Sequence, residues 1–157
     1  MKSVLISIRP KWCEKIASGE KTVEVRKTRP KLETPFKCYI YQTMRRENNG
    51  RTYSDGKVIG EFVCDRIYQY ASYFFRSGPL EGTDISTEDM TRLSCLTAKE
   101  LYEYEHSAEP KENCINLIGL YGWHISELQI YDTPKELSEF GLNRTPQSWC
   151  YVEGGEG

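Results

Sequence analysis

The stretch that most limits how this chain folds is KTVEVRK, residues 21–27. Within it, Val23 and Val25 alternate with Glu24 and Arg26. Successive side chains of a β-strand point to opposite faces, so the two valines share one face and the two charged residues share the other. The pattern predicts a strand over 21–27 that packs one face and presents charged groups on the other.

The same period-two alternation recurs along the chain and predicts most of a sheet. Further strands are predicted near residues 4–9, 37–43, 57–69 and 117–131, with a last short strand over 148–152. Gly60 lies inside the longest of these runs, where a glycine indicates a bulge or a bend. The sequence therefore predicts five or six strands.

Short helices are predicted between the strands from their end signals. They are one that begins at Pro10 and ends by Gly19, one after Ser86 with Asp89, one after Thr97 with Glu100, and one opened by a capping box of Thr133 and Glu136 and closed by Gly141. These helical units are too irregular for parallel βαβ alternation, which favours a curled, mixed, mostly antiparallel β-barrel of the α+β class. We expect one domain over residues 1–153 with a helical insertion at about 71–116, and a disordered tail at 154–157.

Composition limits the functions that such a domain can have. The chain has 157 residues, with Lys+Arg 21 against Asp+Glu 23 and a net charge of -2, so any nucleic-acid binding must be local. Its six cysteines form no C-x-x-C pair and it has two histidines, which predicts neither a metal site nor a cofactor. The apolar run at its start is too short for a signal peptide, and no stretch approaches the roughly 20 apolar residues of a membrane helix. A cytoplasmic location with reduced cysteines and no membrane partner is therefore expected.

Three segments resemble a known family. ISIRPKWCEKIASGEKTVEVRK resembles the signature of the ASCH family, a branch of the PUA-like superfamily, in which a strand and a short helix precede a G-x-K-x-x-E-x-R strand. The matching residues here are Gly19, Lys21, Glu24 and Arg26. Residues 56–67 resemble the next long strand of the family, and 121–140 resemble a segment common in small ASCH proteins of bacteria and their prophages. The resemblance implies a small β-barrel with a cleft between the barrel and the helices, related to folds that bind RNA or modified bases.

The resemblance also implies a possible chemistry. In family members that look like acetylcytidine amidohydrolases, the strand reads K-T-x-T-x-R, with the lysine and the second threonine in catalytic roles. This chain matches that pattern at Lys21, Thr22 and Arg26 but has Glu24 in place of the second threonine. The difference favours binding over hydrolysis.

The residue types themselves point to recognition of a nucleotide-like ligand. A carboxylate accepts hydrogen bonds from an exocyclic amine, and a guanidinium donates to carbonyl or phosphate oxygens in a fixed geometry. A helix start next to an aromatic ring suits an anion and a stacked base. The candidate ligand-binding residues are Ser7, Arg9, Lys11, Trp12, Lys21, Thr22, Glu24 and Arg26, and Lys21 and Glu24 are the catalytic candidates if the protein is an enzyme.

Three function classes follow from these observations. The leading one is a binding module, without turnover, for RNA, single-stranded nucleic acid or a modified nucleotide. The second is a hydrolase of a nucleoside amide or of RNA, of the acetylcytidine amidohydrolase or ribonuclease type, which a further acid from the 81–105 helices in the cleft would favour. The third is a protein-interaction adaptor, which an exposed Tyr/Phe patch at 70–75 would favour. The sequence assigns no role to Trp123, His124 or Trp149, and no oligomeric state.

Overall fold

A computed structural model describes residues 2–46, 48–50, 52–54, 56–71, 83–107 and 119–153. The strands are β1 (Lys2–Ile8), β2 (Val23–Arg26), β3 (Phe36–Gln42), β4 (Arg45–Arg46), β5 (Thr52–Ser54), β6 (Lys57–Tyr70), β7 (Leu120–Lys135) and β8 (Trp149–Glu153). The helices are α1 (Pro10–Ala17), α2 (Thr87–Ser94), α3 (Ala98–Glu105) and the short 3₁₀ helix η1 (Leu137–Phe140). The predicted tail at 154–157 and the start of the strand predicted at 117–131 lie outside the described residues.

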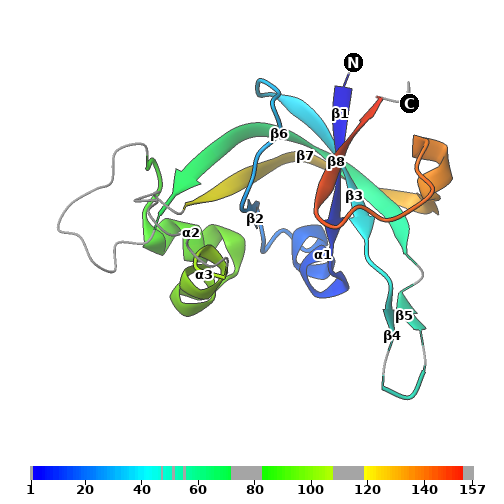
Figure 1. The fold of residues 1–157 in the computed structure, drawn as a ribbon, viewed down its shortest axis with the longest axis horizontal. Helices are drawn as coiled ribbons and strands as arrows, with labels where there is room; N and C mark the ends of the chain where they lie inside the picture. Colours follow the sequence, from blue (N-terminus) through cyan, green and yellow to red (C-terminus); the bar gives the residue numbers. More distant parts are fainter. Residues whose placement is uncertain are drawn as a thin grey trace, which may run out of the picture.

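The described residues form a six-stranded sheet in the order β2-β7-β6-β3-β1-β8, with β4 and β5 as a separate two-stranded ribbon. β1 and β3 pair in parallel, and every other neighbouring pair in the six-stranded sheet is antiparallel. The α+β class and the mixed, mostly antiparallel sheet are therefore confirmed. The sheet is strongly curved (Figure 1), but it does not close into a full barrel, because β2 and β8 are its two edges.

Local signals placed three helices correctly. Pro10 is in the first turn of α1, and Gly19 follows the helix with a φ of 85°. The Ser86 side chain accepts from the Asp89 backbone at the start of α2, and Thr97 and Glu100 form the capping box of α3. In Figure 1, α1 and the α2–α3 pair lie below the arch of the sheet, with β2 between them in this view.

The prediction of a helix that opens at Thr133 is wrong. β7 continues through Pro134 to Lys135, which pairs with Val58 of β6. In the described residues β2 pairs with residues 121–124 of β7, so at Pro134 one edge of β7 carries no ladder, which is the setting in which strands tolerate proline. The capping box instead joins Glu136 and Glu139, and the helix that Gly141 closes is 3₁₀.

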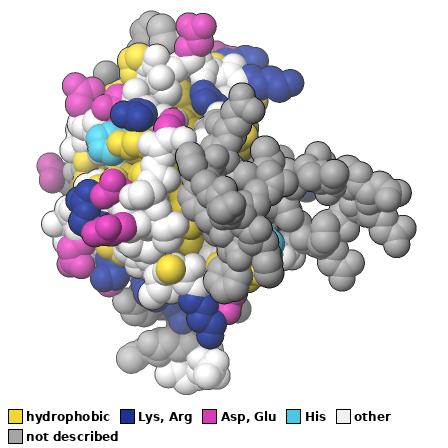
Figure 2. Space-filling view, turned by 90° about the vertical axis from the view of Figure 1, so that its left-hand side faces the viewer, with side chains coloured by type: hydrophobic (Ala, Val, Ile, Leu, Met, Phe, Trp, Pro, Cys, Tyr) yellow, Lys and Arg dark blue, Asp and Glu magenta, His cyan; other side chains and the backbone are white. Residues whose placement is uncertain are grey.

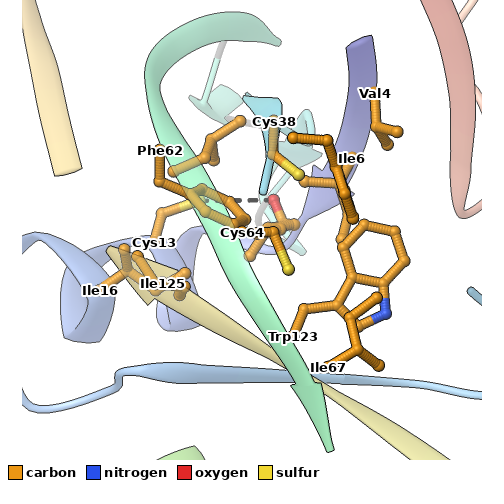
Figure 3. Packing of buried hydrophobic residues seen from close by; sticks show 13 residues of the cluster. Val4, Ile6, Cys13, Ile16, Cys38, Phe62, Cys64, Ile67, Trp123 and Ile125 are labelled. Atoms are coloured by element: carbon orange, nitrogen blue, oxygen red, sulfur yellow. Dashed lines mark hydrogen bonds between the residues drawn. The ribbon is translucent and has the colours of Figure 1, made fainter. Parts of the chain in front are cut away.

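Both faces of the sheet are buried, which the alternation in β2 alone did not reveal. Val4, Ile6 and Ile8 belong to the core cluster that α1 covers, together with Trp123 (Figure 3). Val23 and Val25 belong to another cluster, with Met90 and Leu101 of the helical pair. A third cluster lies around Leu5, Tyr39 and Tyr41, with Leu137 and Phe140 of η1 packed against it.

The cysteines in the core are inert. Cys13, Cys38 and Cys64 are buried, and Figure 3 shows their sulfurs among apolar side chains. Burial raises the pKa of Cys13 and of Cys64 to about 12 and raises that of Cys38 well above its ordinary value. The thiols therefore stay protonated at neutral pH, which disfavours nucleophilic attack by these cysteines.

An ion pair between β3 and β6 should make stability depend on pH. The Glu61 carboxylate accepts from Lys37 Nζ at 2.9 Å and from the Tyr131 hydroxyl at 2.9 Å. Partial burial raises the pKa of Glu61, but these hydrogen bonds outweigh it and the pKa is lowered from its ordinary value of 4.5. A lowered folded-state pKa stabilises the fold above the unfolded value, and this contribution disappears as pH falls through the folded one.

We therefore expect Glu61→Gln to lower the free energy of unfolding at pH 7 and to have a smaller effect at pH 3. Urea unfolding of both proteins at the two pH values measures the difference. An equal cost at both pH values would show that the charge of Glu61 contributes nothing.

Candidate functional site

The turn after α1 places Lys21 below the sheet. Gly19 takes a positive φ, and the Lys21 backbone N–H donates to the Lys15 carbonyl at 3.0 Å. Glycine adopts this backbone conformation without steric cost. β2 then carries Glu24 and Arg26 on the face that it shares with Trp123, because Glu24 pairs directly with Trp123 of β7.

Lys21, Glu24 and Arg26 form a buried ion network. Lys21 Nζ lies 3.5 Å from Glu24 Oε2, and Arg26 Nε lies 3.3 Å from Glu24 Oε1. Lys21 is 3% and Glu24 7% exposed, so water screens these charges weakly. One carboxylate therefore serves two cations.

The network has unused hydrogen-bonding capacity. Glu24 Oε2 and Arg26 Nε are buried and, although within ion-pair distance, make no hydrogen bond among the described residues. Buried polar atoms are nearly always hydrogen-bonded, so each exception requires a cause. Trp123 Nε1 is also buried without a partner among the described residues, and Trp123 is the cross-strand neighbour of Glu24. The unsatisfied atoms therefore gather on the paired strands β2 and β7.

Lys21 is held by groups that stabilise an ammonium. Its Nζ donates to the Ser94 carbonyl at 2.7 Å, at the C-terminus of α2. The negative end of a helix dipole attracts a cation there. The same Nζ lies 5.1 Å from the centre of the Trp12 ring, within reach of a cation–π contact. These contacts suit Lys21 to electrostatic recognition rather than to nucleophilic attack.

A cavity of about 540 Å³ opens over this network. It lies between residues of α1, β2 and α3, and it is lined by Arg9, Trp12, Lys21, Glu24, Val25, Arg26, Leu96, Glu100, Glu103, Tyr104 and Gln147. Five of the eight predicted ligand-binding residues are among them.

The other three predicted residues are placed differently. Ser7 Oγ donates to the Pro146 carbonyl, and it is the Ser7 carbonyl that accepts from Arg26. On β1 it is Val4, Ile6 and Ile8 that face the core containing Trp123, so the Ser7 side chain points to the opposite face. Lys11 is exposed, with Nζ 4.7 Å from the Trp12 ring centre, and the Thr22 backbone N–H donates to Leu93.

Helix α3 forms one wall of the cavity, and the sequence did not predict this. Glu100, Glu103 and Tyr104 recur three and four residues apart, which places them on one side of a helix. Burial, partly offset by the nearby Arg26 guanidinium, raises the pKa of Tyr104, so its hydroxyl stays protonated. The helical spacing of these residues is visible in the sequence, but no local pattern shows that α3 packs next to β2.

Comparison with known proteins identifies the family. The model of the ASCH domain matches residues 6–122, well over half of the chain. The chain belongs to the ASCH domain family. Comparison with curated proteins gives no match.

Solved structures show the same fold. The crystal structure of ASCH from Zymomonas mobilis is 20% identical, with a TM-score of 0.64, covering 96% of this chain and 87% of that one. A tyrosine-to-phenylalanine mutant of the Zymomonas mobilis protein is 20% identical, with a TM-score of 0.64 and coverage of 98% and 91%. A serine-to-alanine mutant is 18% identical, with a TM-score of 0.64 and coverage of 96% and 88%. At this identity the likeness shows that the chain shares the fold of these ASCH structures, and it leaves function to the site.

The residues that the sequence left unassigned lie outside the cavity of this ASCH domain. Trp123 is in the core, edge-on to Trp149, whose Nε1 donates to Thr28 Oγ1 at 2.9 Å. His124 Nδ1 lies 2.6 Å from Asp65 Oδ1. Within the described ranges, no three His, Cys, Asp or Glu residues are grouped to hold a metal ion, and no helix is long and apolar enough to cross a membrane.

Proposed function

We propose that this ASCH domain binds a nucleotide-like ligand whose base enters the cavity and donates an exocyclic amine to Glu24. The observation that carries the proposal is the buried Glu24 Oε2, which makes no hydrogen bond among the described residues although Lys21 and Arg26 flank it. Glu24 lines the cavity, so a small rotation of its carboxylate would bring this acceptor to an amine of the ligand. An acceptor next to that amine would meet Lys21 or Arg26.

The size and lining of the cavity support a ligand of this kind. About 540 Å³ lies within the usual range for small-molecule sites. Trp12 and Tyr104 supply aromatic surface for a planar ring, on α1 and α3 respectively. A nucleobase needs polar partners for its edge and aromatic surface for its faces, and this cavity offers both.

The charge of the lining favours one nucleotide over a long strand. Three basic residues, Arg9, Lys21 and Arg26, match three acidic ones, Glu24, Glu100 and Glu103. The face turned to the viewer in Figure 2 likewise mixes basic and acidic side chains. A strand bound through its phosphates needs a continuous basic track, which this balance does not supply.

The test is a titration of CMP and UMP, followed by tryptophan fluorescence because Trp12 lines the cavity. We expect CMP to bind more tightly than UMP by about 1–3 kcal/mol, because cytosine carries the amine and uracil a carbonyl. Glu24→Gln should reduce that preference, because an amide can donate to the uracil carbonyl.

Glu103→Gln is the matched control, since Glu103 lines the same cavity but is exposed on α3. It should keep the preference for CMP. Equal affinity for both nucleotides, or a preference that survives in Glu24→Gln, would contradict the proposal. Tight binding of a short RNA without binding of CMP would instead indicate a strand-binding module.

A hydrolase is the second candidate, and one observation favours it. Glu100 and Glu103 bring further acids to the cavity, as general acid–base chemistry needs. Glu100 already accepts from the Thr97 backbone in its capping box, and Glu103 is in an exposed 3.8 Å ion pair with Lys99, a weaker restraint, so Glu103 is the acid more easily turned to a ligand. Incubation with acetylcytidine tests this candidate: turnover that Lys21→Ala and Glu24→Ala abolish would establish the hydrolase, whereas we expect none.

The adaptor hypothesis gains no support. Tyr70 is 2% exposed, so it forms no surface patch. Tyr73, Phe74 and Phe75 lie outside the described residues.

A further inference from the structure

The curved sheet leaves an opening between its edge strands. In the described part of the chain, β2 and β8 lie at opposite ends of the strand order and share no ladder. In a curled sheet without backbone closure, side-chain contacts across the gap are what can join the two edges. We call the gap between β2 and the β1–β8 edge the seam.

Arg26 spans this seam. Its Nη2 donates to the Ser7 carbonyl of β1 at 2.6 Å, and its Nη1 donates to Ser148 Oγ, just before β8, at 3.1 Å. Ser148 is itself tied to β1, because its carbonyl accepts from the Ser7 backbone N–H at 2.8 Å. The guanidinium therefore joins the last residue of β2 to two points that are already fixed to each other.

Two further contacts cross the seam nearby. Trp149 Nε1 donates to Thr28 Oγ1 at 2.9 Å, and the Lys31 backbone N–H donates to the Tyr151 hydroxyl at 2.7 Å. Arg26 differs from these in one respect. Its Nε also forms a 3.3 Å ion pair with Glu24 Oε1, so the group that crosses the seam is also next to the carboxylate in the cavity.

We infer that Arg26 and Ser148 form a strap that holds the open side of the sheet and positions Glu24. Arg26 has five N–H groups in a planar fork. The strap uses one from each Nη, and Nε lies 3.3 Å from Glu24 Oε1 as an ion pair. Ser148 is a positioning residue: it does not line the cavity, yet it sets the orientation of the guanidinium that does. The inference stands without the proposed ligand, since it rests on contacts within the chain.

The experiment follows the Arg26 side-chain N–H signals by NMR in the protein without ligand. In the wild type, we expect separate, slowly exchanging Nη signals, because both ends of the fork are held. In Ser148→Ala, the protection of these protons should fall by about tenfold, as loss of one hydrogen bond to a charged group predicts. Unchanged Arg26 signals in Ser148→Ala, or averaged Nη signals already in the wild type, would overturn the strap.

Thr28→Val is the matched control. It removes the neighbouring seam contact at an exposed position and should shift the Trp149 indole signal while leaving the Arg26 signals in place. Arg26→Lys keeps the charge but lacks the fork that reaches both the Ser7 carbonyl and Ser148 Oγ, so it should shift the backbone amide signals of Ser7 and Ser148. Unchanged amide signals would count against the strap.

A binding measurement distinguishes a positioning role of Ser148 from an effect on the stability of the fold alone. Ser148→Ala should weaken CMP binding by about tenfold through Glu24, and Thr28→Val should leave it unchanged. If CMP binds and both variants weaken it equally, the positioning role is wrong. If CMP does not bind the wild type, the proposed function fails, and the Arg26 signals still decide the strap.

Discussion

Replacing Glu24 with alanine is expected to lower the free energy of unfolding by about 3–5 kcal/mol, because it leaves buried charge without a partner. Lys21 would lose its carboxylate while it remains 3% exposed, and Arg26 would lose the oxygen that faces its Nε. Lys21 Nζ is held at the Ser94 carbonyl and the Arg26 guanidinium at Ser148 Oγ, so both charges stay in place. Urea unfolding monitored by circular dichroism measures the change.

Two companion variants identify the cause. Glu24→Gln keeps an oxygen that accepts from either cation, so it should cost less than Glu24→Ala. Lys21→Met should also cost less, because Glu24 retains Arg26 and the methionine fills the space beside Trp12. A cost below about 1 kcal/mol for Glu24→Ala, typical of an exposed pair, would show that water reaches the network.

The parts of the fold that the sequence predicted are those that neighbouring residues decide. Ser86 and Thr97 cap helices in the structure because a side-chain oxygen three residues before a free backbone N–H is sufficient. Gly60 marks register shifts against both β3 and β7, as a glycine inside a strand suggested. Such features need no knowledge of what lies across the sheet.

The parts that were wrong depend on distant partners. Thr133 has the sequence of a helix start, but pairing of Lys135 with Val58 keeps the chain extended through it. Ser7 alternates with buried residues, but on β1 both faces pack, so alternation did not show which face meets Glu24. The sequence also did not show that the barrel stays open, since closure depends on which strands become edges.

The candidate site likewise has one part that the local sequence indicates and one part that depends on distant packing. Five of the candidate residues, Arg9, Trp12, Lys21, Glu24 and Arg26, come from one continuous segment and line the cavity. Tyr104 reaches the same cavity from α3, because Met90 and Leu101 of the helical pair pack with Val23 and Val25. That docking is decided by shape across more than 60 residues of sequence, which no local pattern encodes.

Gly60→Ala should be the most disruptive single-methyl change in the sheet, costing about 3 kcal/mol through overpacking. The Cβ of an alanine there would lie 2.5 Å from the Gln129 carbonyl oxygen and 3.2 Å from Ile130 Cα. Both contacts are to backbone, which cannot rotate aside as a side chain would. β6 and β7 would have to separate where their register shifts.

Gly141→Ala is the control for Gly60→Ala, because it tests backbone strain without overlap. Gly141 has a φ of 74° with nothing within 4 Å of an added Cβ, so alanine should cost only about 1 kcal/mol. A bulge bends its strand, and the bend at Gly60 lies in the strand that joins the β2–β7 half of the sheet to the β3–β1–β8 half. Gly60→Ala should therefore weaken the Arg26 strap as well as the fold, while Gly141→Ala leaves the Arg26 signals unchanged. Equal costs for the two variants, measured by urea unfolding, would mean that the strands separate freely at Gly60 and that the bend there does not hold the two halves of the site in position.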